Sequence, residues 1–380
     1  MVKVALGMIV KNEAHCIERC LNSVKDFIDL VYINDNGSID GTQEKIFEWC
    51  MDNKMRVVVN SVPWVDFGFN RSDVLSKIYR DHKEIDYILM IDADEVLTFA
   101  AGTNPETLKE SLTCDLYDIE TKLGGFNYMR AQLFSNKYRW MYKGVLHEYP
   151  ESIDPTSTRE TLKGVRNIPI QDSARNKNPN KFADDAKMLQ VAYEKETDPF
   201  LKSRYCFYLA QSYKDSGDKY NASMYYSRRL DLGFWSEEIY ISLLSVHRIE
   251  NSIMDISDQL PIELLKAIDV NPNRAEAYFE LMLYFKGKNN WRAAYLFGKE
   301  AITKVKNPYF LFIENWIYDY AAQFEMSIIA WYAKDKELGH LLTKLCIQNP
   351  LLPQNYRETA KNNLKFYEPS AAPATASAGS

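Results

Sequence analysis

The stretch from Tyr87 to Leu97 constrains the fold of this chain more than any other. It begins with an uninterrupted apolar run, Tyr87 to Ile91, and then carries three acids, Asp92, Asp94 and Glu95. A run of this length without polar alternation predicts a strand that is buried on both faces, as in a parallel sheet. The acids then lie at the carboxyl end of that strand, where open α/β sheets bind their ligands.

Clustered carboxylates repel one another unless a cation lies among them. Two aspartates separated by one residue, as in Asp92-x-Asp94, supply hard oxygen ligands that suit Mg²⁺ or Mn²⁺ shared with a diphosphate. For the pair alone, a solvated turn with acids that bind nothing is the simpler interpretation. The sequence on either side of the pair reverses that balance.

The first third of the chain alternates strand and helix patterns. Strands are expected over 2–10, 30–33, 56–60 and 87–91, and helices over 14–24, 43–51 and from 71 to about 82. This order predicts a right-handed, largely parallel α/β sheet. The chain lacks the Gly-rich fingerprints of dinucleotide-binding and P-loop proteins, so both of those readings are weak.

The middle segment, residues 115–150, is rich in aromatic residues and predicts strands over 116–121, 128–134 and 140–148. Alternation at 128–134 indicates antiparallel edge strands. A short strand is expected just before Ile168.

From Phe182 onward, apolar residues recur with helical spacing. The residues around Leu209, Tyr213 and Gly217 match a tetratricopeptide helix pair, and 281–308 repeats the pattern. Such repeats pack only on their neighbours and form a curved interaction surface. We therefore expect three parts: an α/β domain over 1–180, an all-α helical-repeat domain over 181–367, and a disordered, low-complexity tail over 368–380.

Composition excludes several classes of protein. The 380 residues carry a net charge of -6, so no global basic field favours nucleic acid or an acidic membrane. Six cysteines show neither a C-x-x-C pair nor a zinc spacing, which indicates free thiols in a reducing compartment. The N-terminus does not read as a signal peptide, and no apolar run reaches the roughly 18 residues of a membrane helix. We expect a soluble, cytoplasmic protein.

Four separate blocks carry a resemblance to a known family. They are V-K-N-E at 10–13, D-N-G-S-I-D-G-T at 35–42, W-x-D-F at 64–67 followed by Arg71, and I-D-A-D-E at 91–95. Their order and spacing resemble family 2 glycosyltransferases of the GT-A fold, over about residues 1–180. The resemblance implies a GT-A domain that binds a nucleoside-diphosphate sugar, in the first place a UDP-sugar, together with Mn²⁺ or Mg²⁺.

The resemblance also implies a set of nucleotide-sugar contacts: Val10, Asn12, Glu13, Asp35, Asp66, Arg71, Asp92 and Ala93. Asp35 would accept the N–H of a uracil ring. Arg71 would face the diphosphate, because its fixed fork of donors suits phosphate oxygens. Alternatives stay open: Asp35 as a turn former and Glu13 as a helix cap. Ser72 stands where the family usually has Asn.

The string G-V-L-H-E at 144–148 resembles a block of those family members that carry a helical-repeat tail. The resemblance implies that His147 and Glu148 lie near the anomeric carbon of the donor, one of them as general base. Adjacent residues of a strand point to opposite faces, so only one should act. We favour Glu148 as the base and His147 as a hydrogen-bonding or metal-facing neighbour. A purely structural His–Glu pair at a strand end is the alternative.

The expected metal ligands are Asp92, Asp94 and Asp172. Similar enzymes often present a His at the position of Asp172, and a carboxylate can replace an imidazole on Mg²⁺ or Mn²⁺. The basic loop at 175–181 would then close over the donor and offset leaving-group charge. A solvated run of charges is the equally simple alternative for this loop.

The predicted reaction is metal-dependent transfer of a hexose or pentose, with inversion, to an unidentified acceptor: a glycan, a peptide or a modified nucleic-acid base. One alternative is a nucleotidyltransferase of similar fold, which usually needs a Gly-rich, basic first loop that K-N-E lacks. Another is a repeat scaffold with an inactive transferase domain, against which the intact Asp35, Asp92, Asp94 and Glu148 argue. A homo-oligomer formed through the helical domain is a further expectation.

Overall fold

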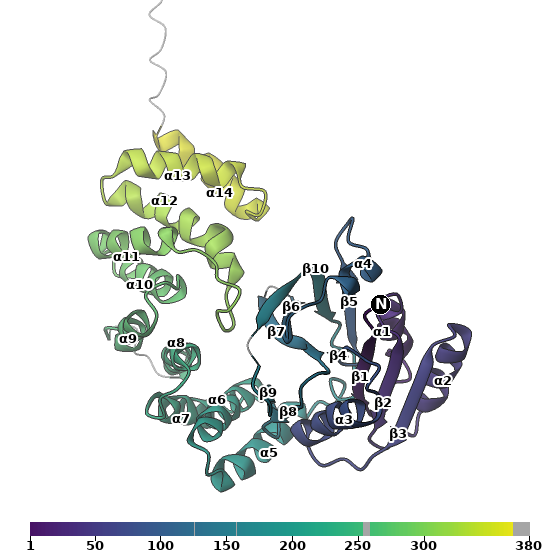
Figure 1. The fold of residues 1–380 in the computed structure, drawn as a ribbon. Coiled ribbons are helices and arrows are strands. Elements are labelled where there is room, and N and C mark those ends of the chain that lie inside the picture. Colours follow the sequence, from purple (N-terminus) through teal and green to yellow (C-terminus); the bar gives the residue numbers. More distant parts are fainter. Residues whose placement is uncertain (125, 157, 254–258, 368–380) are drawn as a thin grey trace, which may run out of the picture. The chain divides into compact units, whose positions relative to one another are not determined.

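The computed structural model describes residues 1–124, 126–156, 158–253 and 259–367 (Figure 1). Contacts within the chain divide it into two compact units. The first consists of Met1–Glu238 and Pro308–Phe312, and the second of Ile239–Asn307 and the chain from Ile313 onward. The predicted tail over 368–380 lies outside the described residues.

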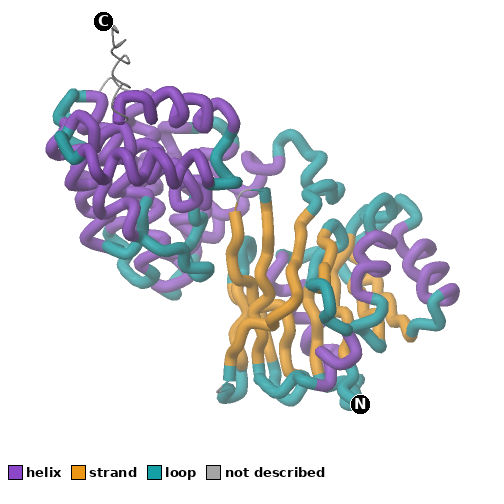
Figure 2. Tube along the Cα trace, turned by 90° about the horizontal axis from the view of Figure 1, so that it is seen from above, coloured by secondary structure: helices purple, strands orange, loops and turns teal. Residues whose placement is uncertain are grey.

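An eight-stranded mixed sheet forms the first unit, in the order β3-β2-β1-β4-β7-β6-β10-β5 (orange in Figure 2). Its strands are β1 Val4–Val10, β2 Leu30–Asp35, β3 Arg56–Ser61, β4 Tyr87–Met90, β5 Glu95–Phe99, β6 Leu116–Leu123, β7 Phe126–Ser135 and β10 Arg159–Pro169. The first four strands run parallel, and β7 pairs antiparallel with both β4 and β6. The expected fold class, a mostly parallel GT-A-type α/β sheet followed by helices, is confirmed.

Helices cover both faces of the parallel part of this sheet, as the uninterrupted apolar runs require. Helices α1 Ile17–Val24 and α2 Thr42–Asp52 pack on the face that carries Leu6, Ile33 and Leu89. Helix α3 Phe67–Asp81 packs on the opposite face. The carboxyl ends of β1, β2 and β4 therefore share one edge of the sheet, between two helical layers.

Several element boundaries differ from the sequence prediction. Strand β7 is antiparallel as expected, but it lies between β4 and β6, so the expected edge position is wrong. Helix α1 begins at Ile17 rather than 14, because residues 14–16 form a turn. Helix α3 begins before Arg71, because Asp66 caps it by accepting the Phe69 N–H at 2.7 Å.

The single strand predicted over 140–148 is also wrong. Strands β8 Trp140–Lys143 and β9 Tyr149–Ser152 form a separate two-stranded sheet, and residues 144–148 form the loop between them. Gly144 and His147 adopt positive φ values of 104° and 53°. These left-handed conformations cannot continue a strand, and they are the reason that it ends at Lys143.

Three helices follow the sheet within the first compact unit: α5 Lys181–Lys195, α6 Pro199–Asp215 and α7 Lys219–Leu230. Secondary structure changes from mixed to helical near residue 180, whereas the first unit extends to Glu238. The short helix α4 Pro105–Glu110 lies earlier in the chain, between β5 and β6. The domain boundary at 180 remains a prediction about folding units.

The second unit is helical throughout its described part (purple in Figure 2). Its helices are the larger part of α8 Ser236–Ile253, then α9 Ile262–Val270, α10 Glu276–Gly287, α11 Trp291–Thr303, a π-helical turn Ile317–Ala321, α12 Ala322–Tyr332, α13 Lys336–Gln348 and α14 Gln354–Tyr367. Its core contains Phe279, Met282, Ala294 and Ile329. Among the described residues, no helix has the length and apolar character needed to span a membrane.

Candidate functional site

The carboxyl edge of β1, β2 and β4 gathers most of the predicted site residues. Val10 pairs in register with Asp35, so the ends of β1 and β2 are level. The loops that leave this edge carry the following predicted residues: Asn12 and Glu13 after β1, and Asp92, Ala93 and Asp94 after β4. The clustering expected from the alternating pattern is therefore present, whatever role each residue has.

Arg71 of α3 reaches into this edge and joins two of the predicted carboxylates. Its Nη2 donates to Asp92 Oδ1 at 2.5 Å, and its Nε lies 2.7 Å from Glu148 Oε1 in an ion pair without hydrogen-bond alignment. The Arg71 side chain is only 5% exposed. Within the described residues its buried Nη1 has no hydrogen-bond partner. Arg71 thus holds two acids and keeps one donor unused.

Arg130 of β7 is the cation among the clustered acids, and sequence reasoning did not identify it. Its Nη1 donates to Glu95 Oε1 at 2.6 Å, and its Nη2 donates to Asp92 Oδ2 at 3.3 Å. Burial opposes ionisation of Asp92, but the charges of Arg71 and Arg130 outweigh burial and hold the pKa of Asp92 well below its usual range. Burial raises the pKa of Glu95. One signal was available: a charged residue within the alternating strand next to β4.

The loop at 144–148 places its two candidate bases in different surroundings. Glu148, whose side chain is 10% exposed, faces Arg71. The ring of His147 stacks on Tyr208 of α6, with centroids 4.0 Å apart and planes at 11°. The two side chains are thus separated, and the prediction that only one of them acts as base stays a prediction. The cause of the separation is the left-handed backbone at His147 rather than strand alternation.

Surroundings of the His147 ring disfavour its charged form. Desolvation by neighbouring atoms, followed by the charges of Arg204, Arg175 and Lys181, lowers the pKa of His147 to about 3. More than a third of the residue's surface is nevertheless open to solvent. At neutral pH the imidazole is uncharged.

Two glycines bring α3 and the loop into direct backbone contact. A Cβ added to Gly68 would lie 2.3 Å from the carbonyl oxygen of Gly144, closer than any side chain permits. The Phe67 N–H donates to the Val145 carbonyl at 3.2 Å at the same place. The helix that carries Arg71 and the loop that carries Glu148 are thereby held together.

Glu13 and Asp94 are buried acids that the loop after β10 connects. Asp94 Oδ2 accepts the Ser173 N–H at 3.3 Å and the Asn176 Nδ2 at 3.1 Å. Glu13 accepts the Ala174 N–H at 3.3 Å. Burial, and then the charge of Asp94, raises the pKa of Glu13, although a hydrogen bond from Cys16 opposes the shift.

Glu13 and Asp94 offer carboxylate oxygens for a divalent cation, and within the described structure the ligand atoms of Glu13, His15 and Cys16 lie within 4.8 Å of one another. Asp92 is neutralised by its two arginines, and Asp172 forms a bidentate ion pair with Arg19 at 2.6 and 2.9 Å. Across the described ranges, Asp94 forms no direct ion pair with Lys or Arg, although Lys181 and Arg19 lie close enough for their charges to interact with it. Both acids present the oxygen ligands that Mg²⁺ and Mn²⁺ prefer. The predicted roles of Asp92 and Asp172 as ligands remain untested predictions.

The remaining predicted nucleotide contacts are engaged locally. Asp35 accepts the Ser38 N–H at 3.0 Å and its hydroxyl at 2.7 Å, and Gln43 Nε2 donates to the other oxygen. Asn12 Oδ1 accepts the Ile39 N–H at 2.9 Å. Asp66 is the N-cap of α3. A donor base at Asp35 would therefore have to exchange with Ser38 or Gln43.

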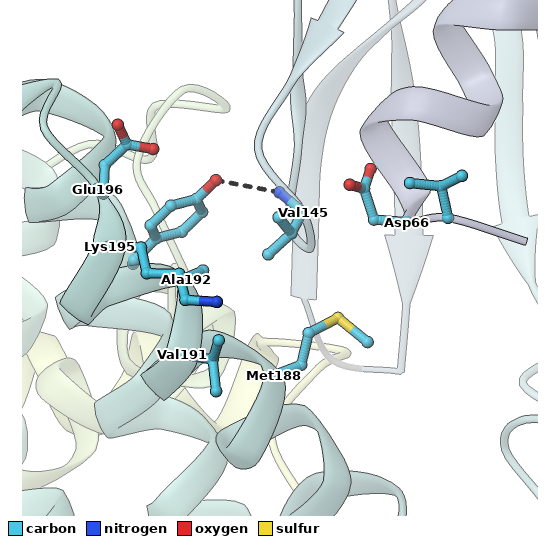
Figure 3. A pocket seen from close by; sticks show the side chains of 9 residues that line it. Asp66, Val145, Met188, Val191, Ala192, Lys195 and Glu196 are labelled. Carbon is cyan, nitrogen blue, oxygen red and sulfur yellow. Dashed lines mark hydrogen bonds between the residues drawn. The ribbon is translucent and has the colours of Figure 1, made fainter.

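One cavity of about 500 Å³ lies apart from this cluster, between α5 and the start of α3 (Figure 3). Its lining is formed by Val65, Asp66, Val145, Met188, Val191, Ala192, Lys195, Glu196 and Tyr205. Neither Arg71 nor Glu148 lines it. Its relation to the acid cluster runs through the loop at 144–148, because Val145 forms part of the wall.

Comparisons with known proteins agree with this picture. The family described as glycosyl transferase family 2 matches residues 6–101. A TPR repeat-containing protein of Synechococcus elongatus is 31% identical over 153 residues, which cover 39% of this chain and 35% of that protein. An uncharacterized glycosyltransferase of Rickettsia felis is 27% identical over 162 residues, covering 41% of this chain and 53% of that protein. The chain thus spans about a third to a half of these relatives' length.

Solved structures with similarity include S. aureus TarS 1–349 in complex with UDP, at a TM-score of 0.31 and 13% identity, covering 72% of this chain and 90% of that one. A second is MamA, at a TM-score of 0.33 and 16% identity, covering 52% and 98%. Residues 6–101 are thus similar to glycosyl transferase family 2, and the relatives that this chain resembles include a glycosyltransferase and a TPR repeat-containing protein.

Proposed function

We propose that this protein transfers a sugar, with inversion, from a nucleoside-diphosphate sugar to an acceptor. The buried Arg71 carries the proposal. Its Nη1 has no hydrogen-bond partner among the described residues, and a buried donor without an acceptor is costly unless a ligand completes it. A phosphate oxygen suits this donor, because guanidinium groups bind phosphates directionally. The similarity of residues 6–101 to glycosyl transferase family 2 and the position of Arg71 at the carboxyl edge of the sheet support the same proposal.

Within this proposal, each residue has a separate role. Arg71 binds the diphosphate and offsets the charge that develops as the nucleotide departs. Glu148, held beside Arg71, takes the proton of the acceptor nucleophile as that nucleophile attacks the anomeric carbon from the side opposite the leaving group. A bound Mn²⁺ or Mg²⁺ would add further positive charge at the diphosphate, and Asp94 with Glu13 would hold it.

The test of the base is the Glu148→Gln variant, compared with Glu151→Gln. Glu151 lies on the adjacent strand β9 and pairs with Lys143 at the surface, so it serves as a matched control. Glu148→Gln should bind donor nearly normally by calorimetry but transfer sugar about 10²–10⁴-fold more slowly. The readout is product mass from a panel of sugar nucleotides and acceptors. An unchanged rate for Glu148→Gln would place the base elsewhere, with His147 or Glu95 next.

The choice of uracil nucleotide is tested separately. If the Asp35 carboxylate reads the base, UDP should bind more tightly than ADP or GDP. At equal concentration UDP should then raise the unfolding temperature more, because tighter binding stabilises the native state more. Asp35→Asn should remove most of this preference. Equal shifts for the three nucleotides in the wild type would contradict a base-reading role for Asp35.

A further inference from the structure

One face of helix α6 holds the loop at 144–148 at three points. The Val145 N–H donates to the Tyr205 hydroxyl at 3.1 Å. Arg204 Nε donates to the His147 carbonyl at 3.0 Å, and the Tyr208 ring stacks on the His147 ring. Residues 204, 205 and 208 lie on adjoining positions of one helix, so they act on the loop together.

The α6 side of this contact is itself fixed. Arg204 Nη1 donates to Glu238 Oε1 at 3.1 Å, and both side chains are largely buried, at 13% and 2% exposed. The guanidinium carbon of Arg204 lies 4.8 Å from the ring centroid of Tyr208 and 5.5 Å from that of Tyr149. Arg204 is thus constrained on several sides, and it presents Nε to the loop in one orientation.

The loop needs support of this kind. It carries two left-handed residues, Gly144 and His147, and it lies outside the regular pairing of β8 with β9. From the α3 side, the Phe67 N–H holds the Val145 carbonyl. From the α6 side, the Tyr205 hydroxyl holds the Val145 N–H. Glu148 follows directly, and its distance to Arg71 depends on where this loop is held.

We propose that Tyr205 and Arg204 are positioning residues for Glu148, so that the first tetratricopeptide-like helices form part of the catalytic apparatus. This inference rests on the proposed function, in which Glu148 is the base. Neither α6 residue touches the reacting atoms. They fix the backbone from which the carboxylate extends, and small displacements of a catalytic group cost rate steeply.

The test compares Tyr205→Phe with Tyr213→Phe in the full chain. Tyr213 lies on the same helix, and its hydroxyl donates to Gln190 at 2.8 Å, away from the loop, so each variant removes one hydroxyl from α6. Tyr205→Phe should lower kcat about tenfold and leave the donor KM and donor affinity unchanged, because the carboxylate is misplaced but the donor site is intact. Tyr213→Phe should leave kcat unchanged.

A double-mutant cycle separates positioning from a general loss of structure. In a Glu148→Gln background, Tyr205→Phe should cause no further loss of rate, because the group that it positions is already inactive. Additive losses, or equal losses for Tyr205→Phe and Tyr213→Phe, would overturn the inference. If Tyr205→Phe is unstable, Arg204→Lys replaces it in the test. This variant keeps the charge but loses the planar fork, and it should lower kcat and leave the donor KM unchanged. A wild-type protein without transferase activity would overturn the proposed function instead.

Discussion

Two buried arginines in different regions of the molecule differ in how completely their donors are used. Arg274, in the helical unit, is 0% exposed and forms a two-point contact with Glu276, at 3.1 and 2.7 Å. Its guanidinium also lies over the Tyr240 ring, 4.4 Å from the centroid. Arg71, at the edge of the sheet, is buried almost as deeply yet keeps Nη1 without a partner in the described structure. Arg274 pairs with an acid of its own unit, whereas Arg71 keeps a donor that we propose a phosphate oxygen completes.

The largest effect should come from exchanging each arginine for methionine. Arg71→Met should slow transfer by about 10²–10³-fold, because it removes a charge aimed at the leaving group. Arg274→Met should instead destabilise the fold by about 3–5 kcal/mol, because Glu276 loses its buried partner. Its rate per folded molecule should remain that of the wild type. Transfer-rate assays and denaturant unfolding on both variants measure this difference. An equal loss of transfer rate in Arg71→Met and Arg274→Met would contradict the different roles of the two arginines.

A smaller effect, on Mn²⁺ affinity, is expected to differ between two aspartates that have different partners. Asp172 is occupied by Arg19, whereas Asp94 contacts amides of the loop after β10. Asp94→Asn should weaken Mn²⁺ binding by at least about tenfold, since even changes beyond the direct ligands cost that much. Asp172→Asn should leave Mn²⁺ binding unchanged. Calorimetric titration of Mn²⁺ measures both. Unaltered affinity in Asp94→Asn, or full wild-type activity in EDTA, would exclude this assignment.

The smallest effect concerns His147 and pH. Its pKa is lowered in the folded protein, to about 3, while the unfolded chain has the ordinary value near 6.5. Between these values the unfolded state binds the extra proton, so stability is full above pH 6.5 and falls as the pH is lowered through this window. His147→Gln should flatten the decline of the unfolding free energy between pH 6.5 and 4, by at most about one proton's worth of slope. Identical slopes would show that the ring is freely hydrated.

The fold could be predicted from the sequence because burial has a clear signature. Strand β4 is buried along its whole length, as its unbroken apolar run implies. The helices of the second half could also be predicted, because their apolar residues recur with helical spacing even where the tetratricopeptide pattern is incomplete. Where backbone conformation decides the outcome, prediction failed: nothing in the apolar pattern of 140–148 shows that His147 adopts a left-handed φ.

The site was predictable only in part. Acids at strand ends are visible in a sequence, and those after β1, β2 and β4 do converge. Their counter-charges are not visible, because Arg130 arrives from a strand about 35 residues later and Arg19 meets Asp172 across 153 residues. The support of the loop by α6 was equally hidden. Tyr205 and Tyr208 match the repeat pattern, and the same ring can fill a helical core and hold a neighbouring loop.

The contact between Gly68 and Gly144 also limits which substitutions the protein could accept. Because any side chain at Gly68 would overlap the Gly144 carbonyl oxygen, the missing side chain of Gly68 fixes how closely α3 approaches the loop at 144–148. A substitution at Gly68 would therefore change the spacing between Arg71 and Glu148. In the proposed transferase, a change of acceptor during evolution would therefore have to arise at other residues, while the close packing of Gly68 on Gly144 is kept.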